Sequence, residues 1–434
     1  MYHEFEITDN FKKKFAHFVS TIAHAPILSI PAFAVINYFL LDWYNFIIIT
    51  VVSALFAAIL PITIVLMWSK KNSKDADIPE KEDRKYPLIV VIISYFIGAV
   101  ILYMLNAPPI TTFLMFCYFS NTLIVFFINF FWKISIHSMG VAGPTTALIY
   151  TFGYIGSILG LIIPIVMWSR VYLKRHTIPQ VIMGATLGFI LTAIQIYILY
   201  LYIYNVKLDV NPILWLIYAF MGPSIVLSMA GFLNKLGVHD GYTRKMFHFI
   251  AFISIAIFLR YAPSDATIIF ITVGIIYVGI ACFSGNDFLW FNGIRRKSDH
   301  PNELLYVIFP LISTVLGLSI SWIVFGHPFV EIGMLCVAIG DAVAEPIGVR
   351  FGKHRYKVYS LTGRPSERSL EGSSAVLLSC AIIIFFTTYN LTLSLIAGVI
   401  ISLIEAISPR GTDNFTVLFG ASMILSIGVI YFKF

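Results

Sequence analysis

The sequence predicts an all-α protein with many membrane-spanning helices, and its composition and apolar runs carry that prediction. The 434 residues are 59% hydrophobic and 12% charged, and the mean hydropathy is +0.88. Soluble globular chains carry about 45–50% apolar and about 25% charged residues. Long apolar runs recur along the chain, and most approach the roughly 20 residues that a helix needs to cross the hydrocarbon core. The composition therefore excludes a cytosolic enzyme, a disordered chain and a secreted disulfide scaffold.

The apolar runs predict the spans in chain order. They lie near 17–41, 45–68, 87–105, 110–132, 178–204, 213–234, 246–264, 266–285, 302–326, 328–347, 372–390, 392–408 and 414–432. A further stretch, 141–168, has Gly153 and Gly156 at its middle and is compatible with one long helix or with a hairpin of two short ones.

The distribution of basic residues decides between these two readings. With a hairpin at 141–168, 26 of the 29 Lys and Arg residues fall on one side of the membrane. With a single span, the two sides carry 13 and 16. Because basic loops stay in the cytoplasm, the hairpin is favoured. The sequence thus predicts about 15 crossings, short hairpin arms that tilt or are shielded by neighbours, and an integral membrane protein whose basic side is cytoplasmic. In a prokaryote this would be the cell membrane.

The remaining general features set the domain organisation and exclude several roles. Residues 205–212 interrupt the apolar pattern, so we expect two domains, 1–207 and 208–434. The formal charge of +7 is assigned to cytoplasmic loops, not to nucleic-acid binding.

The N-terminal apolar stretch is too long for a signal peptide. The four cysteines lie in apolar runs without a metal-binding pattern and are interpreted as core or lipid-facing residues: Cys117, Cys282, Cys336 and Cys380. The oligomeric state is not indicated.

The stretch 340–374 carries the strongest chemical signal. Asp341 and Glu345 are four residues apart and share one helix face. Carboxylates at membrane depth are costly and usually functional. Beside glycine-rich backbone and basic residues, they suit a magnesium–nucleotide site. The alternative is a helix-end carboxylate paired with Arg350 or Lys353. No G-x-x-x-x-G-K-[ST] pattern is present, so a P-loop is not indicated.

Several polar motifs of the C-terminal half stand in a characteristic order. They are Gly340-Asp341, Ala344, Gly348, Phe351-Gly352, then Arg368-Ser369-Leu370-Glu371-Gly372-Ser373, then Glu405 and Asp413-Asn414, with Arg244, Lys245 and His248 upstream. Over about 211–434 the pattern resembles the polyprenol kinase family of phytol, farnesol and dolichol kinases, which is related to phosphatidate cytidylyltransferases. The resemblance implies phosphate transfer from CTP, or from ATP, to a membrane isoprenoid alcohol such as phytol, farnesol, geranylgeraniol or a polyprenol.

The same resemblance implies roles for individual residues. Asp341, Arg368 and Asp413 would be catalytic, and Asp341 with Glu345 would hold Mg²⁺. Residues implied to bind nucleotide or phosphate are Arg244, Lys245, His248, Gly348, Gly352, Lys353, Glu371, Gly372, Ser373 and Asn414. Two positions depart from the family pattern: Glu345 stands where Asp is frequent, and Arg368 where Lys is usual. Since Arg and Lys bind phosphate differently, the substrate and the nucleotide stay open.

Two histidines flank the predicted hairpin in the N-terminal half. His137 precedes it, and Ser169, Arg170 and His176 form an S-R-x5-H pattern after it. A hairpin returns both histidines to one side, where one imidazole can act as nucleophile and the other as acid. The alternative is that both are interfacial residues flanking basic loops.

Over about 70–205 these residues resemble the type 2 phosphatidic acid phosphatase superfamily. The resemblance implies His176 as nucleophile, His137 as acid, and Arg84 and Arg170 as phosphate ligands. Gln180 stands where that family has a carboxylate that orients the nucleophilic histidine, so a degenerate domain with a lipid-binding or structural role is an equal alternative.

Together these features predict a CTP-dependent lipid alcohol kinase fused to a phosphatase-like domain. Its expected partners are a nucleotide and a membrane lipid, with Mg²⁺ as cofactor. Three alternatives stay open: a CTP:phosphatidate cytidylyltransferase, an isoprenyl phosphate phosphatase as the main activity, and a transporter. The transporter is disfavoured because the acidic residues gather near one face and no inverted repeat is visible.

Overall fold

The computed structural model describes residues 2–72, 85–286, 288–359 and 366–432. In this part of the chain, 12 helices are long and apolar enough to cross a membrane, or up to 13 if the bent pair α1 (Tyr2–Ile22) and α2 (Ala25–Leu40) is counted as one crossing. The predicted all-α polytopic class is therefore confirmed. The predicted count of about 15 treats the two hairpin arms separately and includes a 17-residue helix that is not among the 12.

The chain divides into two compact units, unit 1 (Met1–Ser224) and unit 2 (Ile225–Phe434). The division falls within helix α10 (Asn211–Lys235), next to Pro223 inside that helix. The segment 205–210, where the sequence suggested the boundary, is the extended connection that precedes α10.

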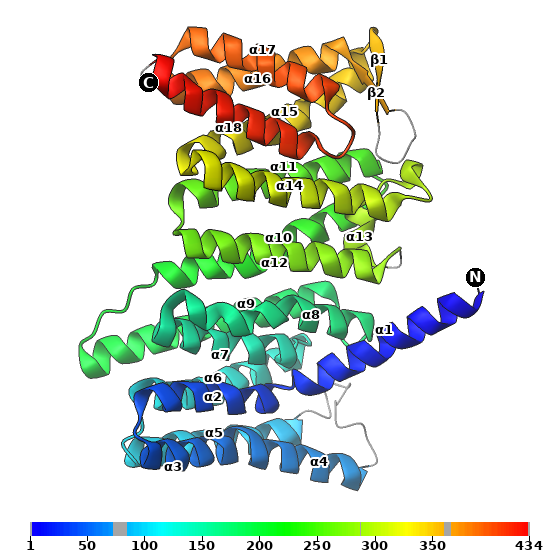
Figure 1. The fold of residues 1–434 in the computed structure, drawn as a ribbon. Coiled ribbons are helices and arrows are strands. Elements are labelled where there is room, and N and C mark those ends of the chain that lie inside the picture. Colours follow the sequence, from blue (N-terminus) through cyan, green and yellow to red (C-terminus); the bar gives the residue numbers. More distant parts are fainter. Residues whose placement is uncertain (1, 73–84, 287, 360–365, 433–434) are drawn as a thin grey trace. The chain divides into compact units, whose positions relative to one another are not determined.

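Unit 1 is entirely helical in its described residues (Figure 1). Besides α1, α2 and the first part of α10, its elements are α3 (Trp43–Ala54), the π-helix η1 (Leu55–Ile59), α4 (Leu60–Asn72), α5 (Lys85–Met104), α6 (Pro109–Phe131), α7 (Ile136–Phe152), the 3-10 helix η2 (Gly153–Ile162), α8 (Ile163–Tyr172) and α9 (Ile178–Tyr204). Its main core joins α2, α5 and α6 through buried side chains such as Phe33, Tyr95 and Leu114. Asp42 caps α3, and the hydrogen bond from the Asn45 side chain lowers the pKa of this exposed carboxyl.

The stretch 136–172 folds back on itself, as the charge distribution predicted. Its 37 residues would make a single helix far longer than one crossing of about 20 residues needs. Helix α7 ends at Gly153, whose φ of +64° places it in the conformation that glycine tolerates best. A Cβ atom at Gly156 would overlap the backbone of Leu148, so η2 runs back closely along α7. The lysine that precedes α7, Lys133, accordingly donates a hydrogen bond of 2.7 Å to the carbonyl of Arg175, which follows α8.

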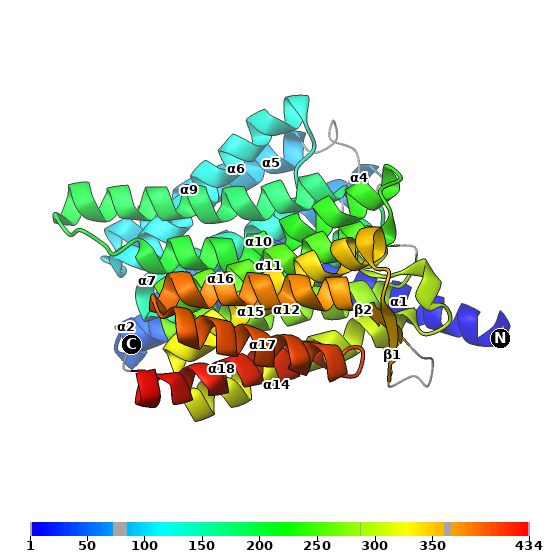
Figure 2. The ribbon, with the colours of Figure 1, turned by 90° about the horizontal axis from the view of Figure 1, so that it is seen from above.

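The described residues of unit 2 form helices and one short two-stranded sheet that the sequence did not predict. After the second part of α10 come α11 (Asp240–Tyr261), α12 (Ser264–Ser284), α13 (Leu289–Ile294), the 3-10 turn η3 (Lys297–Asp299), α14 (Glu303–Phe325), α15 (His327–Phe351), β1 (Arg355–Val358), β2 (Ser366–Ser369), α16 (Leu370–Thr388), α17 (Leu391–Ile407) and α18 (Asp413–Phe432). The antiparallel strands pair Arg355 with Ser369 and Val358 with Ser366. Figure 2 shows β1 and β2 beside one end of α16.

Candidate functional site

A polar cavity of about 500 Å³ lies in unit 2 where several helix ends meet. The first turns of α11, α16 and α18 and the last turns of α15 and α17 contribute to it, together with β1, β2 and the segment around η3. Most residues that the sequence assigned to the C-terminal site line this cavity. They are Arg244, Lys245, His248, Asp341, Glu345, Gly348, Arg368, Gly372, Ser373, Asp413 and Asn414.

Lys245 links the two acidic residues of α15. Its Nζ contacts Asp341 Oδ1 directly and lies 3.3 Å from Glu345 Oε2. The spacing of four residues therefore places both carboxylates on one helix face, as the sequence predicted. His248 Nδ1 lies 3.9 Å from Asp341 Oδ2, one turn further along α11. The motif R-K-x-x-H is thus part of α11, which begins at Asp240, six residues before the span start that the sequence placed near 246.

Arg368 links two further carboxylates of the same cavity. Its Nη1 lies 2.9 Å from Glu405 Oε1, and its Nη2 lies 3.3 Å from Asp413 Oδ2. The planar guanidinium offers a fixed fork of donors, so one residue can address two separate acids. These acids come from α17 and α18, more than 30 residues away in sequence, and the short strand β2 presents Arg368 to both.

Three residues of the predicted set do not line the cavity. Gly352 caps the end of α15, and Lys353 follows it. Glu371 accepts hydrogen bonds from the backbone N–H of Lys353 at 3.1 Å and lies 2.9 Å from His354 Nδ1. In this structure Glu371 therefore stabilises the segment between α15 and β1.

Other polar residues line the cavity without having been assigned to it from sequence. They are Arg296, Ser298, Asp299, Tyr306, Arg355, Glu367 and Arg410. Glu405, which belongs to the sequence motif but was given no role there, lines the cavity as well. Arg296 Nη2 donates to Glu345 Oε1 at 2.5 Å, although 49 residues separate the two. The only sequence signal for this residue was the basic run Arg295-Arg296-Lys297, which was interpreted as part of a cytoplasmic loop.

The donor set fits a nucleotide-bound magnesium ion better than a metal held by protein alone. Within the described ranges, no group of three or more His, Cys, Asp or Glu side chains is placed to hold a metal. Magnesium, however, commonly takes one or two protein carboxylates and completes its shell with water and substrate phosphates. Asp341 and Glu345 supply such a pair, and the neighbouring basic side chains suit phosphate oxygens.

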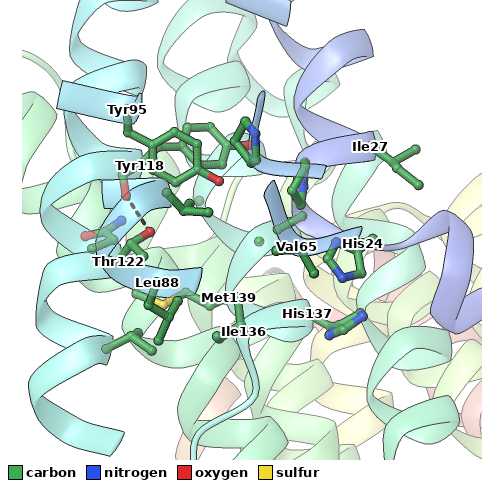
Figure 3. Close-up of a pocket in the computed structure, with 18 of the residues that line it drawn as sticks. His24, Ile27, Val65, Leu88, Tyr95, Tyr118, Thr122, Ile136, His137 and Met139 are labelled. Carbon is green, nitrogen blue, oxygen red and sulfur yellow. Dashed lines mark hydrogen bonds between the residues drawn. The ribbon is translucent and has the colours of Figure 1, made fainter. Parts of the chain in front are cut away.

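A second, mostly apolar cavity of about 380 Å³ lies within unit 1 (Figure 3). Both predicted histidines, His137 and His176, line it, and so does His24, which the sequence did not single out. The rings of His24 and His137 meet edge to face with centroids 4.8 Å apart. His176 Nδ1 lies 3.3 Å from Gln180 Oε1, so this glutamine contacts the imidazole from the position where the resemblance expected a carboxylate.

The two arginines predicted for this half have different outcomes. Arg170 is buried and donates to the hydroxyl of Ser20 at 2.5 Å, and Ser20 lines the cavity although Arg170 does not. Arg84 lies outside the described residues. All four cysteines are free thiols: three are buried and Cys282 is partly exposed.

Comparison with known proteins gives one informative similarity. The chain is 32% identical over 108 residues to a phytol kinase of Synechocystis sp., a match that covers 23% of this chain and 44% of the relative. The chain therefore spans less than half the length of this curated relative. No protein-family model matches the sequence, and no solved structure matches it. The similarity supports a polyprenol or phytol kinase-like family in part, and nothing in the comparisons supports the phosphatase-like expectation for the N-terminal half.

Proposed function

We propose that unit 2 is a kinase that transfers the terminal phosphate of a nucleoside triphosphate, CTP or ATP, to a membrane isoprenoid alcohol. One observation carries the proposal: basic and acidic side chains from α11, α15, β2, α17 and α18 converge on one polar cavity. The partial similarity to a phytol kinase supports the same reaction class. The cavity lies at the ends of apolar helices, where a soluble nucleotide and a lipid hydroxyl can meet.

The reaction needs positioning and charge stabilisation more than covalent chemistry from the protein. The alcohol oxygen forms a bond to the γ-phosphorus as the bond to the bridging oxygen breaks, the nucleoside diphosphate leaves, and the hydroxyl proton passes to a carboxylate. Asp341 and Glu345 would hold Mg²⁺, which supplies charge neutralisation on the phosphates. Lys245, Arg244 and Arg368 hold phosphate oxygens in place, and Glu405 and Asp413 orient Arg368.

A labelling experiment distinguishes the kinase from its nearest alternative. The purified protein in lipid nanodiscs is supplied with α- or γ-labelled CTP or ATP and a panel of phytol, farnesol, geranylgeraniol and polyprenol. We expect γ-label in the lipid product. Label from the α-position would instead indicate a cytidylyltransferase, and absence of labelled lipid with every alcohol would contradict both.

The variant Asp341→Asn tests the site assignment. Loss of this charge removes the proposed magnesium ligand and the partner of Lys245, so we expect at least a 100-fold fall in kcat. Glu331→Gln is the matched control. Glu331 is a buried carboxylate on the same helix, it accepts a hydrogen bond of 2.7 Å from Arg260, and neither residue lines the cavity. Activity of Asp341→Asn within a few-fold of the unsubstituted protein would exclude this assignment.

We propose a second, separate activity for unit 1, hydrolysis of a lipid phosphate. The favouring observation is that the hairpin brings His137 and His176 to one apolar cavity. Under this proposal His176 attacks phosphorus, the P–O bond to the lipid breaks, and His137 protonates the leaving oxygen. Water then attacks the phosphohistidine, the P–N bond to His176 breaks, and inorganic phosphate leaves. If both units acted on one lipid they would form a futile cycle, so the proposal includes different lipid substrates for the two.

Release of inorganic phosphate from isoprenyl monophosphates and from phosphatidate measures this second activity. We expect release that disappears in His176→Asn and persists in Asp341→Asn, because the two cavities belong to different units. A binding or structural role for unit 1 would be favoured if His176→Asn released as much inorganic phosphate as the unsubstituted protein, or if neither lipid released any.

A further inference from the structure

We propose that Asp299 is a positioning residue that holds Arg244 and Arg410 as a pair of guanidinium groups for the nucleotide phosphates. This inference rests on the proposed kinase function and adds Arg410 to the phosphate-binding groups. Neither Asp299 nor Arg410 was assigned a role from the sequence, and they lie 55 and 166 positions from Arg244 in the chain.

Asp299 occupies a central position between the two arginines. Its side chain is 4% exposed and belongs to the short turn η3. Its Oδ1 accepts a hydrogen bond of 2.9 Å from Arg410 Nη2, and its Oδ2 lies 3.5 Å from Arg244 Nη1. Arg244 comes from the first turns of α11 and Arg410 from the segment between α17 and α18. A single carboxylate therefore joins guanidinium groups from two distant elements.

Tyr306 fixes the orientation of both guanidinium groups. The Arg410 guanidinium lies over the Tyr306 ring, 4.3 Å from its centroid. Arg244 Nη2 donates a hydrogen bond of 2.7 Å to the Tyr306 carbonyl. Stacking on an aromatic face and hydrogen bonding at one edge restrict a guanidinium to one plane, which lowers the ordering cost when a ligand binds.

The charge and the remaining donors of this cluster favour an anion. Two guanidinium groups share one carboxylate, which leaves one positive charge, and Arg244, Asp299, Tyr306 and Arg410 all line the polar cavity. Buried Arg244 Nη1 makes no hydrogen bond to any described residue. Each arginine has five N–H donors, so both retain donors beyond those that Asp299 and Tyr306 engage. Phosphate oxygens match these donors in charge and in fork geometry.

Nucleotide binding, measured without turnover, tests the inference. The probe is a non-hydrolysable analogue of CTP or ATP, whichever the unsubstituted protein uses, titrated with Mg²⁺ into nanodisc-embedded protein. We expect Asp299→Asn to weaken binding about 10- to 100-fold, because the two arginines lose their shared ionic partner. The KM for the nucleotide should rise similarly, while the KM for the alcohol stays within about threefold. Glu331→Gln, the buried carboxylate outside the cavity, should leave nucleotide binding unchanged.

A second variant keeps the test informative if Asp299→Asn does not fold. Arg410→Lys keeps the charge but loses the planar fork, so we expect weaker nucleotide binding at an unchanged melting temperature. The double variant Asp299→Asn/Arg410→Lys should have about the same nucleotide affinity as whichever single variant binds nucleotide more weakly, because both changes disturb the same contact.

The outcomes separate this inference from the proposed function. If the unsubstituted protein binds no nucleotide, the kinase proposal itself fails. If it binds nucleotide and folded Asp299→Asn or Arg410→Lys binds equally well, the positioning role is overturned. Equal rises in the KM for nucleotide and for alcohol, with a lower melting temperature, would assign Asp299 a purely structural role and also overturn the inference.

Discussion

At the scale of single residues, the contacts that each side chain makes at the site say more about its role than its residue type does. Asp341 and Glu345 share a helix face, yet only Glu345 also binds Arg296. The shared helix face and the contact with Arg296 are both consistent with a phosphate site, but Arg296 and Glu345 lie 49 positions apart in the sequence. Sequence spacing predicts contacts along one helix and gives no information on such distant pairs.

Arg368 gives a prediction at this scale. It stands where the resembled family usually has lysine, and its two terminal nitrogens face different acids, Glu405 and Asp413. A lysine has one compact ammonium group and cannot keep both contacts in the same geometry. We expect Arg368→Lys to lower kcat/KM about 10-fold in the lipid kinase assay. Arg350→Lys, an exposed position on α15 outside the cavity, is the control and should stay within about twofold. Full activity of Arg368→Lys would show that the positive charge alone suffices.

At the scale of elements, the hairpin of α7, η2 and α8 links the charge distribution to a cavity. Apolar composition alone permits one long helix over 136–172. The excess of basic residues on one side favoured a reversal, and the structure contains it at Gly153. The reversal is what brings His137 and His176, 39 positions apart, to one cavity.

A glycine substitution tests the packing of this hairpin. An added methyl group at Gly156 would overlap the backbone of Leu148, so the arms must separate. We expect Gly156→Ala to destabilise unit 1 by about 1–3 kcal/mol, the usual range for overpacking, and to lower the melting temperature. Gly279→Ala on α12 is the control, because nothing lies within 4 Å of its added methyl group and alanine favours the helix. A melting temperature of Gly156→Ala equal to or above that of Gly279→Ala would contradict the close packing.

At the scale of the whole molecule, the few charged residues determine the expected orientation in the membrane. In the predicted topology, 26 of 29 basic residues face the cytoplasm, and the loops that carry both candidate sites lie on that side. A cytoplasmic location would give the proposed kinase access to nucleotide. This orientation stays a prediction.

Labelling of single cysteines checks the orientation. In a background without the four native cysteines, we expect Lys174→Cys and Lys297→Cys to react with a membrane-impermeant maleimide only after permeabilisation. Asp209→Cys and Asp265→Cys should react in intact cells. All four positions are exposed in the structure. Labelling of Lys174→Cys and Lys297→Cys from opposite sides would contradict a shared cytoplasmic face.

The sequence by itself determined the class of this protein, most of its spans, the hairpin and 11 of the residues that line the polar cavity. These features are local, because a membrane requires each crossing to satisfy its own backbone hydrogen bonds within about 20 apolar residues. The short strands, Arg296, and the cluster of Asp299, Tyr306 and Arg410 emerged only in the tertiary structure. Their partners lie in other helices, and ion pairing in a buried cavity depends on how distant elements converge, which no local pattern of residues encodes.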